Sequence, residues 1–282
     1  MPASALADQY IQIGQIRTRF WAMGDTGPAV VLVHGLGRYV EDWQPTIHVL
    51  ARRHRVYALD LAGSGRSDKP PPPYSFPGLV QFVADFIQAH HIERASLVGH
   101  SLGGSLALHY AIQFPNRVEK LVLVNSAGLG KQVRPSLKLS TLPFIGERLT
   151  RPSRKGISES LKRSVHDPAL VTDEWIELCY RQATLPGAHR AMLATARALV
   201  DLSGVRDDVV RPVLDNLAHI TAPTLIVWGR QDPSLPVAHA DVAAKRMPNA
   251  HLHVFDACRH FTQLEHPQAF NALLGEFLAG AS

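Results

Sequence analysis

Short apolar runs alternate along the chain with stretches in which apolar residues recur every three or four positions. The runs contain few polar residues, as expected for strands covered on both faces. We predict strands at Val30–Val33, Val56–Leu59, Ser96–Val98, Leu121–Val124, Leu225–Trp228 and His251–Phe255. Helical spacing marks Trp43–Leu50, Leu79–His90, Leu102–Phe114, Ala238–Met247 and Pro267–Leu278. The alternation predicts an α/β fold with a mostly parallel central sheet and helices on both of its faces.

Two segments depart from this alternation. Tyr10–Ala22 has the pattern of an antiparallel hairpin at a sheet edge, turning near Gly14. From about Leu129 to Leu217 no β-type run occurs, while helical patterns cover Asp173–Ala183 and Ala188–Leu202. An all-helical insertion in an α/β domain usually covers the sheet as a lid.

The domain organisation follows from that interruption. We predict a helical cap over residues 129–217, inserted between two parts of one core, residues 1–128 and 218–282. The proline-rich K-P-P-P-P-Y-S at 69–75 is too short for a low-complexity tract, and we interpret it as a stiff surface loop.

Composition and charge exclude several classes of function. The 282 residues are 46% hydrophobic, and the formal net charge of +5 comes from lysines and arginines scattered along the chain. The densest basic group, Arg148 to Lys162, is short, so we expect a solvated face and no nucleic-acid partner. No apolar run approaches the ~18 residues that span a bilayer, and the N-terminus lacks the pattern of a signal peptide. We expect a cytoplasmic protein without a membrane span.

Metal and disulfide chemistry are not indicated either. The two cysteines, Cys179 and Cys258, form no C-x-x-C motif and no disulfide framework, which is typical of a reducing compartment. His251 and His253 alternate on a predicted strand, a pattern more often due to packing than to metal binding. We expect no metal ion and no cofactor.

The candidate nucleophile is Ser101, in Gly99-His100-Ser101-Leu102-Gly103. This G-x-S-x-G follows a predicted strand and precedes a predicted helix, which is the context that the nucleophile elbow requires. A turn this tight strains its central residue, and side chains two positions away would collide with it. Glycines at 99 and 103 remove that collision, and the turn presents the serine hydroxyl at the carboxyl edge of the sheet.

A serine hydroxyl needs a base to take its proton, and the chain offers fifteen histidines. His260 follows the last predicted strand, so it lies in a loop at the same sheet edge as Ser101. His90, His91 and His109 fall on predicted helices, and His266 lies where a helix begins. We therefore select His260.

The candidate carboxylate that orients the base is Asp232. It follows the strand Leu225–Trp228, again at the carboxyl edge, and the proline after it keeps it out of helical conformation. Asp256 is a rival but lies still within the end of a strand. Asn125, which follows another strand, cannot stabilise an imidazolium as a carboxylate can. The order Ser101, Asp232, His260 is the coherent one.

The oxyanion of an acyl-transfer reaction also needs donors. His34-Gly35-Leu36-Gly37 is a glycine-containing loop after a predicted strand. Backbone N–H groups of Leu36 and Leu102 could point at one developing negative oxygen, where each donor contributes about 2.7–4 kcal/mol.

With these motifs placed, the sequence resembles the α/β-hydrolase superfamily over nearly its whole length. V-L-V-H-G-L-G matches the oxyanion loop, V-G-H-S-L-G-G the nucleophile elbow, I-V-W-G-R-Q-D the acid strand and R-H-F-T-Q-L-E-H-P the histidine loop. L-D-L-A-G-S-G-R-S-D-K-P resembles the family's D-x-x-G-x-G-x-S-D turn, where we interpret Asp60, Gly65 and Ser67 as structural. The residue before the family's histidine is usually glycine and here is Arg259, which places a charge beside the site.

The resemblance implies acyl transfer to water through an acyl-enzyme on Ser101. Haloalkane dehalogenases and epoxide hydrolases of this fold need a carboxylate nucleophile, so Ser101 argues against both. We expect a serine hydrolase of small to medium carboxylic esters, the commonest outcome for members with a serine elbow and a helical lid. Gly35, His100, Phe261 and Arg190 are expected to line the substrate pocket.

Two alternatives stay open. The first is a carbon–carbon bond hydrolase of the meta-cleavage-product type, which shares the lid and triad. Those members carry tryptophan directly after the histidine, where this chain has Phe261, and use a lid arginine, for which Arg190 is a positional candidate. The second is a small-molecule receptor of the hydrolase fold with slow turnover. Lactone or amide substrates also fit, and the sequence does not indicate an oligomeric state.

Overall fold

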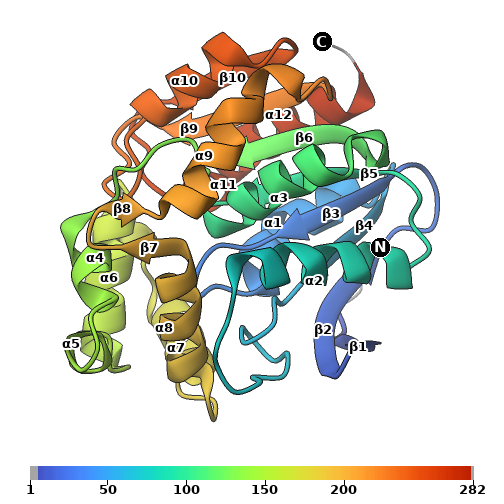
Figure 1. The fold of residues 1–282 in the computed structure, drawn as a ribbon. Helices are drawn as coiled ribbons and strands as arrows, with labels where there is room; N and C mark the ends of the chain where they lie inside the picture. The colour runs from blue at the N-terminus through green and yellow to red at the C-terminus, as the bar shows by residue number, and fades with distance from the viewer. Residues whose placement is uncertain (1–5, 281–282) are drawn as a thin grey trace.

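An eight-stranded sheet forms the centre of the computed structural model, which describes residues 6–280 (Figure 1). Its strands run in the order β1-β2-β4-β3-β5-β6-β9-β10. The first pairs, β1 with β2 and β2 with β4, are antiparallel, and all the others are parallel. The strands are β1 (Gln9–Ile13), β2 (Ile16–Met23), β3 (Ala29–Val33), β4 (Arg55–Leu59), β5 (Ala95–His100), β6 (Val118–Val124), β9 (Thr224–Gly229) and β10 (Ala250–Phe255).

Helices cover both faces of this sheet, which confirms the predicted fold class. One apolar layer joins the sheet to α2, α3, α9 and α10, and a second joins it to α1 and α12. Every side chain of β3 and β5 is buried because both faces are covered. The helices of these layers are α1 (Gln44–Leu50), α2 (Phe76–Ala89), α3 (Leu102–Gln113), α9 (Asp207–Asn216), α10 (Ala238–Arg246) and α12 (Pro267–Ala279), and the short α11 (Thr262–Glu265) precedes α12.

The predicted edge hairpin is present, with β1 outermost in the sheet and its turn at Gly14. Gly14 has φ +57°, a conformation that glycine adopts without a steric penalty. The predicted strands and helices of the core agree with the observed ones to within a few residues at their ends. Short 3₁₀ turns at Val40–Trp43, Pro115–Arg117, Pro168–Leu170 and Leu217–His219 complete the connections.

The segment after β6 leaves the sheet and forms a separate group of helices beside its carboxyl edge (Figure 1). These helices are α4 (Pro135–Ser140), α5 (Ile145–Leu149), α6 (Arg154–Ser164), α7 (Asp173–Ala183) and α8 (Ala188–Leu199). The prediction of a wholly helical segment was wrong in one detail, because β7 (Val200–Asp201) pairs with β8 (Gly204–Val205). The turn between the two strands is closed by Asp201 Oδ1, which accepts the Ser203 N–H at 2.7 Å. Each strand has only two residues, so no hydrophobic periodicity marks it in the sequence.

The last helix of the predicted cap contacts the core. His109 Nε2 on α3 donates to the carbonyl of Val209 on α9 at 2.9 Å, and Val209, Val210 and Val213 join the apolar layer beneath. We therefore propose that the cap consists of α4–α8 with the β7–β8 ribbon, and that α9 belongs to the core. No helix among residues 6–280 is both long and apolar enough to cross a membrane.

Candidate active site

Ser101 lies at the turn between β5 and α3, as the elbow motif predicts. Its backbone has φ +53° and ψ −115°, outside the regions that side chains other than glycine normally adopt. A Cβ on Gly99 would overlap the backbone of Gly103, and one on Gly103 would overlap the carbonyl of Val33. The two glycines therefore let β5, α3 and β3 approach closely enough to hold the strained turn.

His260 and Asp232 are hydrogen-bonded to each other. His260 Nδ1 donates to Asp232 Oδ2 at 2.8 Å, and the Asp232 side chain is fully buried while that of His260 is 11% exposed. The other carboxylate oxygen, Oδ1, accepts the N–H groups of Ser234 at 2.7 Å and Leu235 at 3.2 Å. Asp232 is thus held by its own loop and leaves Nε2 of His260 as the atom available to take a proton.

Asn125 is a residue of this site whose role the sequence reasoning missed. Its side-chain amide donates to Asp232 Oδ2 at 2.8 Å and to the carbonyl of Arg259 at 3.0 Å, while its Oδ1 accepts the Thr262 hydroxyl at 2.7 Å. Asn125 is fully buried, with φ +43°. From the sequence alone, Asn125 is recognisable only as a poor substitute for the acid. Its position one residue after a buried strand was the available signal, because that position faces the same sheet edge.

His100 connects the nucleophile elbow to the histidine loop. Its Nε2–H donates to the carbonyl of His260 at 2.8 Å, and the two imidazole rings lie 4.9 Å apart between centroids. Burial, followed by the charge of His260, holds the pKa of His100 well below its usual range, so this ring stays neutral. Among residues 6–280 no hydrogen bond to Ser101 Oγ is present, so the structure shows the Asp232–His260 half of the predicted triad, and the contact between Ser101 and His260 stays a prediction.

The candidate oxyanion donors are two backbone N–H groups, one in the loop after β3 and one at the start of α3. The N–H groups of Leu36 and Leu102 donate to no residue in the described part of the chain. His34 fixes the loop that carries Leu36, because its Nε2 accepts the Leu61 N–H at 3.0 Å and its Nδ1–H donates to the Gly35 carbonyl at 2.7 Å. Burial lowers the pKa of His34 to about 4, so the ring keeps the neutral tautomer that this arrangement requires.

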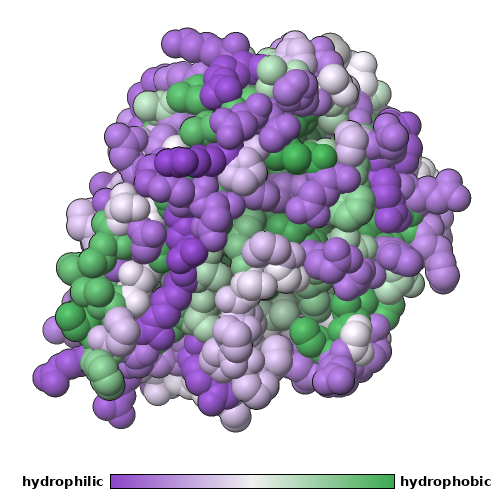
Figure 2. All heavy atoms as spheres, viewed as in Figure 1, coloured by the Kyte–Doolittle hydropathy of each residue, from purple (hydrophilic) through white to green (hydrophobic). Residues whose placement is uncertain are grey.

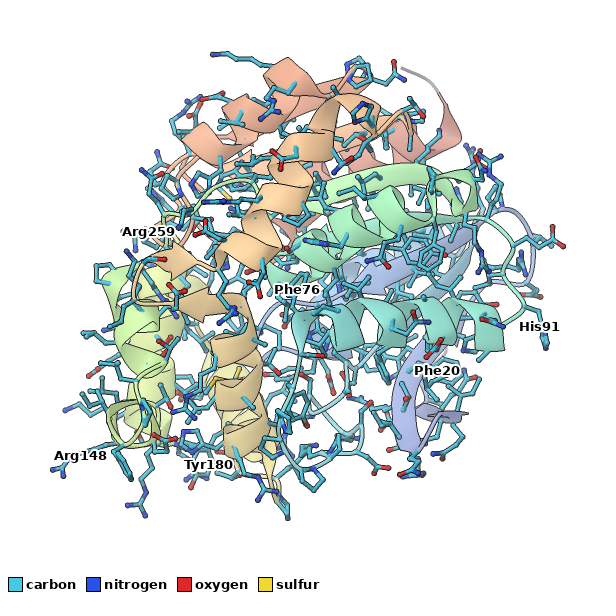
Figure 3. All side chains as sticks on the ribbon, in the orientation of Figure 1. Phe20, Phe76, His91, Arg148, Tyr180 and Arg259 are labelled. Atoms are coloured by element: carbon cyan, nitrogen blue, oxygen red, sulfur yellow. The ribbon has the colours of Figure 1, made fainter. Side chains whose placement is uncertain are left out.

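Two arginines expected near the site point elsewhere. Arg259 donates through Nη1 to the carbonyls of Arg163 at 3.1 Å and Lys162 at 3.5 Å, so it caps the C-terminus of α6 (Figure 3). Arg190 is exposed and lines a surface hollow of about 410 Å³ beside residues 72–77, which lead into α2. Gly35 thus lies beside Ser101, and His100 and Phe261 lie beside His260, whereas Arg190 lines a separate surface hollow.

A buried arginine links the oxyanion loop to the cap. Arg38 Nε donates to Asp42 Oδ2 at 2.7 Å, and its Nη1 donates to Cys179 Sγ on α7 at 3.3 Å. Its guanidinium lies 5.0 Å from the ring centroid of Phe261 and 5.7 Å from that of Trp175, a cation–π arrangement. Aromatic side chains from the core and the cap thus pack beside His260, the candidate base.

Arg134, at the entry to the cap, is held near the loop of Asp232. Its backbone N–H donates to the carbonyl of Ser234 at 3.2 Å, two residues from Asp232. Burial lowers its pKa, the charge of Arg163 lowers it further and that of Asp232 raises it. Arg134 Nε is buried and has no hydrogen-bond partner among the described residues. An acceptor supplied from outside the chain would satisfy it.

The fold and this site define an α/β hydrolase. The sequence profile of the alpha/beta hydrolase fold family matches residues 28–267, and the chain belongs to that family.

Three proteins give the comparison more detail. The chain is 34% identical over 274 residues to 2-hydroxymuconate semialdehyde hydrolase of Pseudomonas sp. strain CF600, covering 94% of this chain and 92% of the relative. A meta-cleavage product hydrolase from Pseudomonas fluorescens IP01 superposes with a TM-score of 0.85 at 29% identity, covering 98% and 99% of the two chains. A membrane phospholipase A superposes with a TM-score of 0.83 at 25% identity, covering 98% and 86%. The first two agree better with the carbon–carbon hydrolase alternative than with the ester hydrolase expected first.

Proposed function

We propose that the chain is a serine hydrolase that cleaves the carbon–carbon bond beside a ketone in vinylogous diketone acids of the meta-cleavage type. The observation that carries this proposal is the 34% identity, over nearly the full length of both chains, to a hydrolase of that class. The hydrogen-bonded His260–Asp232 pair beside the strained Ser101 elbow supplies the machinery that such a reaction needs.

In the proposed reaction His260 takes the proton of Ser101, and Ser101 Oγ adds to the ketone carbon. The oxyanion is met by the N–H groups of Leu36 and Leu102. The bond to the neighbouring carbon then breaks, and its electron pair is delocalised onto the second carbonyl of the substrate. His260 returns its proton to that fragment. Water, deprotonated by His260, then hydrolyses the ester on Ser101, releases a carboxylic acid and restores the enzyme.

The acidic end of such a substrate has a candidate partner in Arg134. Its Nε is buried without an acceptor, and Asp232, the acid whose charge raises its pKa, already receives hydrogen bonds from His260, Asn125 and its own loop. A substrate carboxylate would neutralise Arg134 and satisfy its free donor. Charge-assisted hydrogen bonds of this kind are among the strongest that proteins make.

Ester hydrolysis is a second candidate function, favoured by two observations. Phe261 stands where carbon–carbon hydrolases of this fold carry tryptophan. The similarity to a membrane phospholipase A extends over 98% of this chain. The same triad serves both reactions, because in an ester the leaving group is an alkoxide that needs only the proton held by His260.

The test measures turnover of a vinylogous diketone acid beside p-nitrophenyl esters of increasing acyl length. Carbon–carbon hydrolysis predicts rapid, repeated loss of the dienolate absorbance and slower ester turnover. If the esters are turned over efficiently and the diketone acid is not turned over at all, the proposal is overturned in favour of ester hydrolysis. A single slow turnover of both substrates with retained product would indicate a receptor.

Two variants examine the proposed roles. Ser101→Ala should abolish turnover and labelling by a fluorophosphonate, while the control Ser105→Ala, one turn along α3, keeps both.

Arg134→Gln should raise KM for the diketone acid about tenfold or more, with little change for a neutral ester. The exposed Arg52→Gln is its control. Equal effects of Arg134→Gln on charged and neutral substrates would contradict a role in carboxylate binding.

A further inference from the structure

Four large apolar side chains are exposed together on one corner of the cap, formed by α4, α5 and the turn between them. We call this set the apolar corner. Its members are Leu139, 46% exposed, Phe144, 87%, Ile145, 46%, and Leu149, 61%. In the space-filling view, hydrophobic surface gathers along the lower left edge, over α4 and α5 (Figure 2). Clustered exposed apolar side chains of this size mark interaction surfaces more often than chance.

Phe144 forms the tip of the corner in an unfavourable backbone conformation. Its φ is +63°, a region in which a bulky side chain is a genuine outlier. The Gly146 N–H donates to the Leu142 carbonyl at 2.8 Å and the Arg148 N–H to the Phe144 carbonyl at 3.3 Å, so the turn is a defined one. Within the described chain, little of the Phe144 ring is buried in return for this strain.

Basic side chains occur on α4 and α5 and in the segment that follows α5. Lys138, Arg148, Arg151 and Lys155 form no ion pair with any residue of the described chain. The labelled Arg148 extends outward at this edge of the molecule (Figure 3). The acidic residue of α5, Glu147, is already paired with Arg197 on α8 at 2.7 Å. The surface is therefore apolar at its tip and cationic around it.

We propose that the apolar corner docks on an anionic lipid surface, with Phe144 and Leu149 inserted at the headgroup level and the basic residues against lipid phosphates. Apolar side chains flanked by lysine and arginine are the combination that binds such interfaces. A second copy of this chain fits less well, because two cationic rims would face each other.

The docking surface is attached to the helix that covers the oxyanion loop. Arg197 on α8 donates to the Thr141 carbonyl at 3.0 Å, and His189 on α8 bonds the Thr150 hydroxyl at 2.8 Å. Met192 on the same helix lies against Gly37, beside the candidate oxyanion donor Leu36. A membrane held at the corner would therefore lie next to the cap that covers the site.

Co-sedimentation with lipid vesicles tests the proposal. Vesicles of phosphatidylcholine with phosphatidylglycerol should bind the protein, and vesicles of phosphatidylcholine alone should bind it weakly. Phe144→Gly combined with Leu149→Ser should weaken binding about tenfold or more. The double variant Arg148→Glu with Arg151→Glu should weaken vesicle binding about fivefold or more for each arginine replaced. Glycine suits the backbone at 144, so the first variant keeps the fold.

The control for the apolar variant is Leu202→Ser, which removes a side chain that is 56% exposed in the β7–β8 turn. The control for the charge variant is Arg52→Glu with Arg53→Glu, at exposed positions on the core. Both should bind vesicles as the wild type does, and all variants should turn over a water-dissolved ester equally. Absence of binding to phosphatidylglycerol vesicles, or equal losses in the corner variants and the controls, would overturn the proposal. If the wild-type protein self-associates and Phe144→Gly abolishes that association, the lipid proposal is overturned and the corner binds a second copy of the chain.

Discussion

Asn125 donates its side-chain amide to Asp232 Oδ2 at 2.8 Å, and the same oxygen accepts Nδ1–H of His260 at 2.8 Å. One carboxylate oxygen therefore receives two donors, one from the residue directly after β6 and one from the candidate base. Asn125 in turn is held by Thr262. Asn125 is therefore placed to orient the candidate base His260 through Asp232.

We expect Asn125→Leu to lower kcat about tenfold to a hundredfold with little change in KM, because the lost hydrogen bond supports Asp232 and does not contact substrate. Steady-state kinetics on the preferred substrate measure both constants. The control is Asn116→Leu, at an exposed position in the turn before β6. A change confined to KM would show that Asn125 acts on substrate binding.

Gly103→Ala should destabilise the fold by about 3 kcal/mol, because its Cβ would overlap the carbonyl of Val33 in a sheet that cannot move away. Gly275→Ala in α12 is the control, since nothing lies within 4 Å of its added Cβ. That change should raise stability by about 0.5–1 kcal/mol through helix propensity. Urea denaturation of both variants gives the two free energies of unfolding. Similar values would contradict the packing argument.

The free energy of unfolding should fall as the pH falls from 6.5 toward 4, partly through His34. Its pKa is about 4 in the folded chain and 6.5 when exposed, so in this range the unfolded chain binds a proton that the folded chain excludes. The stabilisation is present above pH 6.5, and up to about 3 kcal/mol is lost on reaching pH 4. In His34→Gln the melting temperature should depend less steeply on pH across this window. Parallel curves for the two proteins would refute the assignment.

Arg38→Met should destabilise the protein by about 3–5 kcal/mol, since it leaves the buried Asp42 carboxylate without its cation. The double variant Arg38→Met with Asp42→Leu removes both charges and should recover most of that loss. Thermal or urea unfolding of the two variants and of Asp42→Leu completes the cycle. Additive losses would mean that the ion pair contributes no coupling.

Much of this molecule is determined by local sequence. Strands such as β3 are uninterrupted apolar runs, and amphipathic helices such as α7 have an apolar stripe, so periodicity locates them. The G-x-S-x-G elbow is local as well, because the steric need for Gly99 and Gly103 arises within one turn. The predicted order Ser101, Asp232, His260 rested on three loops that follow strands, and parallel strands bring such loops to one edge.

The tertiary structure decided the partners of these side chains. Asn125 meets Asp232 only because β6 and β9 are adjacent in the sheet, although 107 residues separate the two side chains. Arg38 reaches Cys179 across 141 residues because α7 packs over the oxyanion loop. Arg190 lines a surface hollow together with residues 72–77, a segment far from it in the sequence. Periodicity records which face of an element is buried, whereas strand order and helix rotation follow from packing between distant segments, which no local pattern contains.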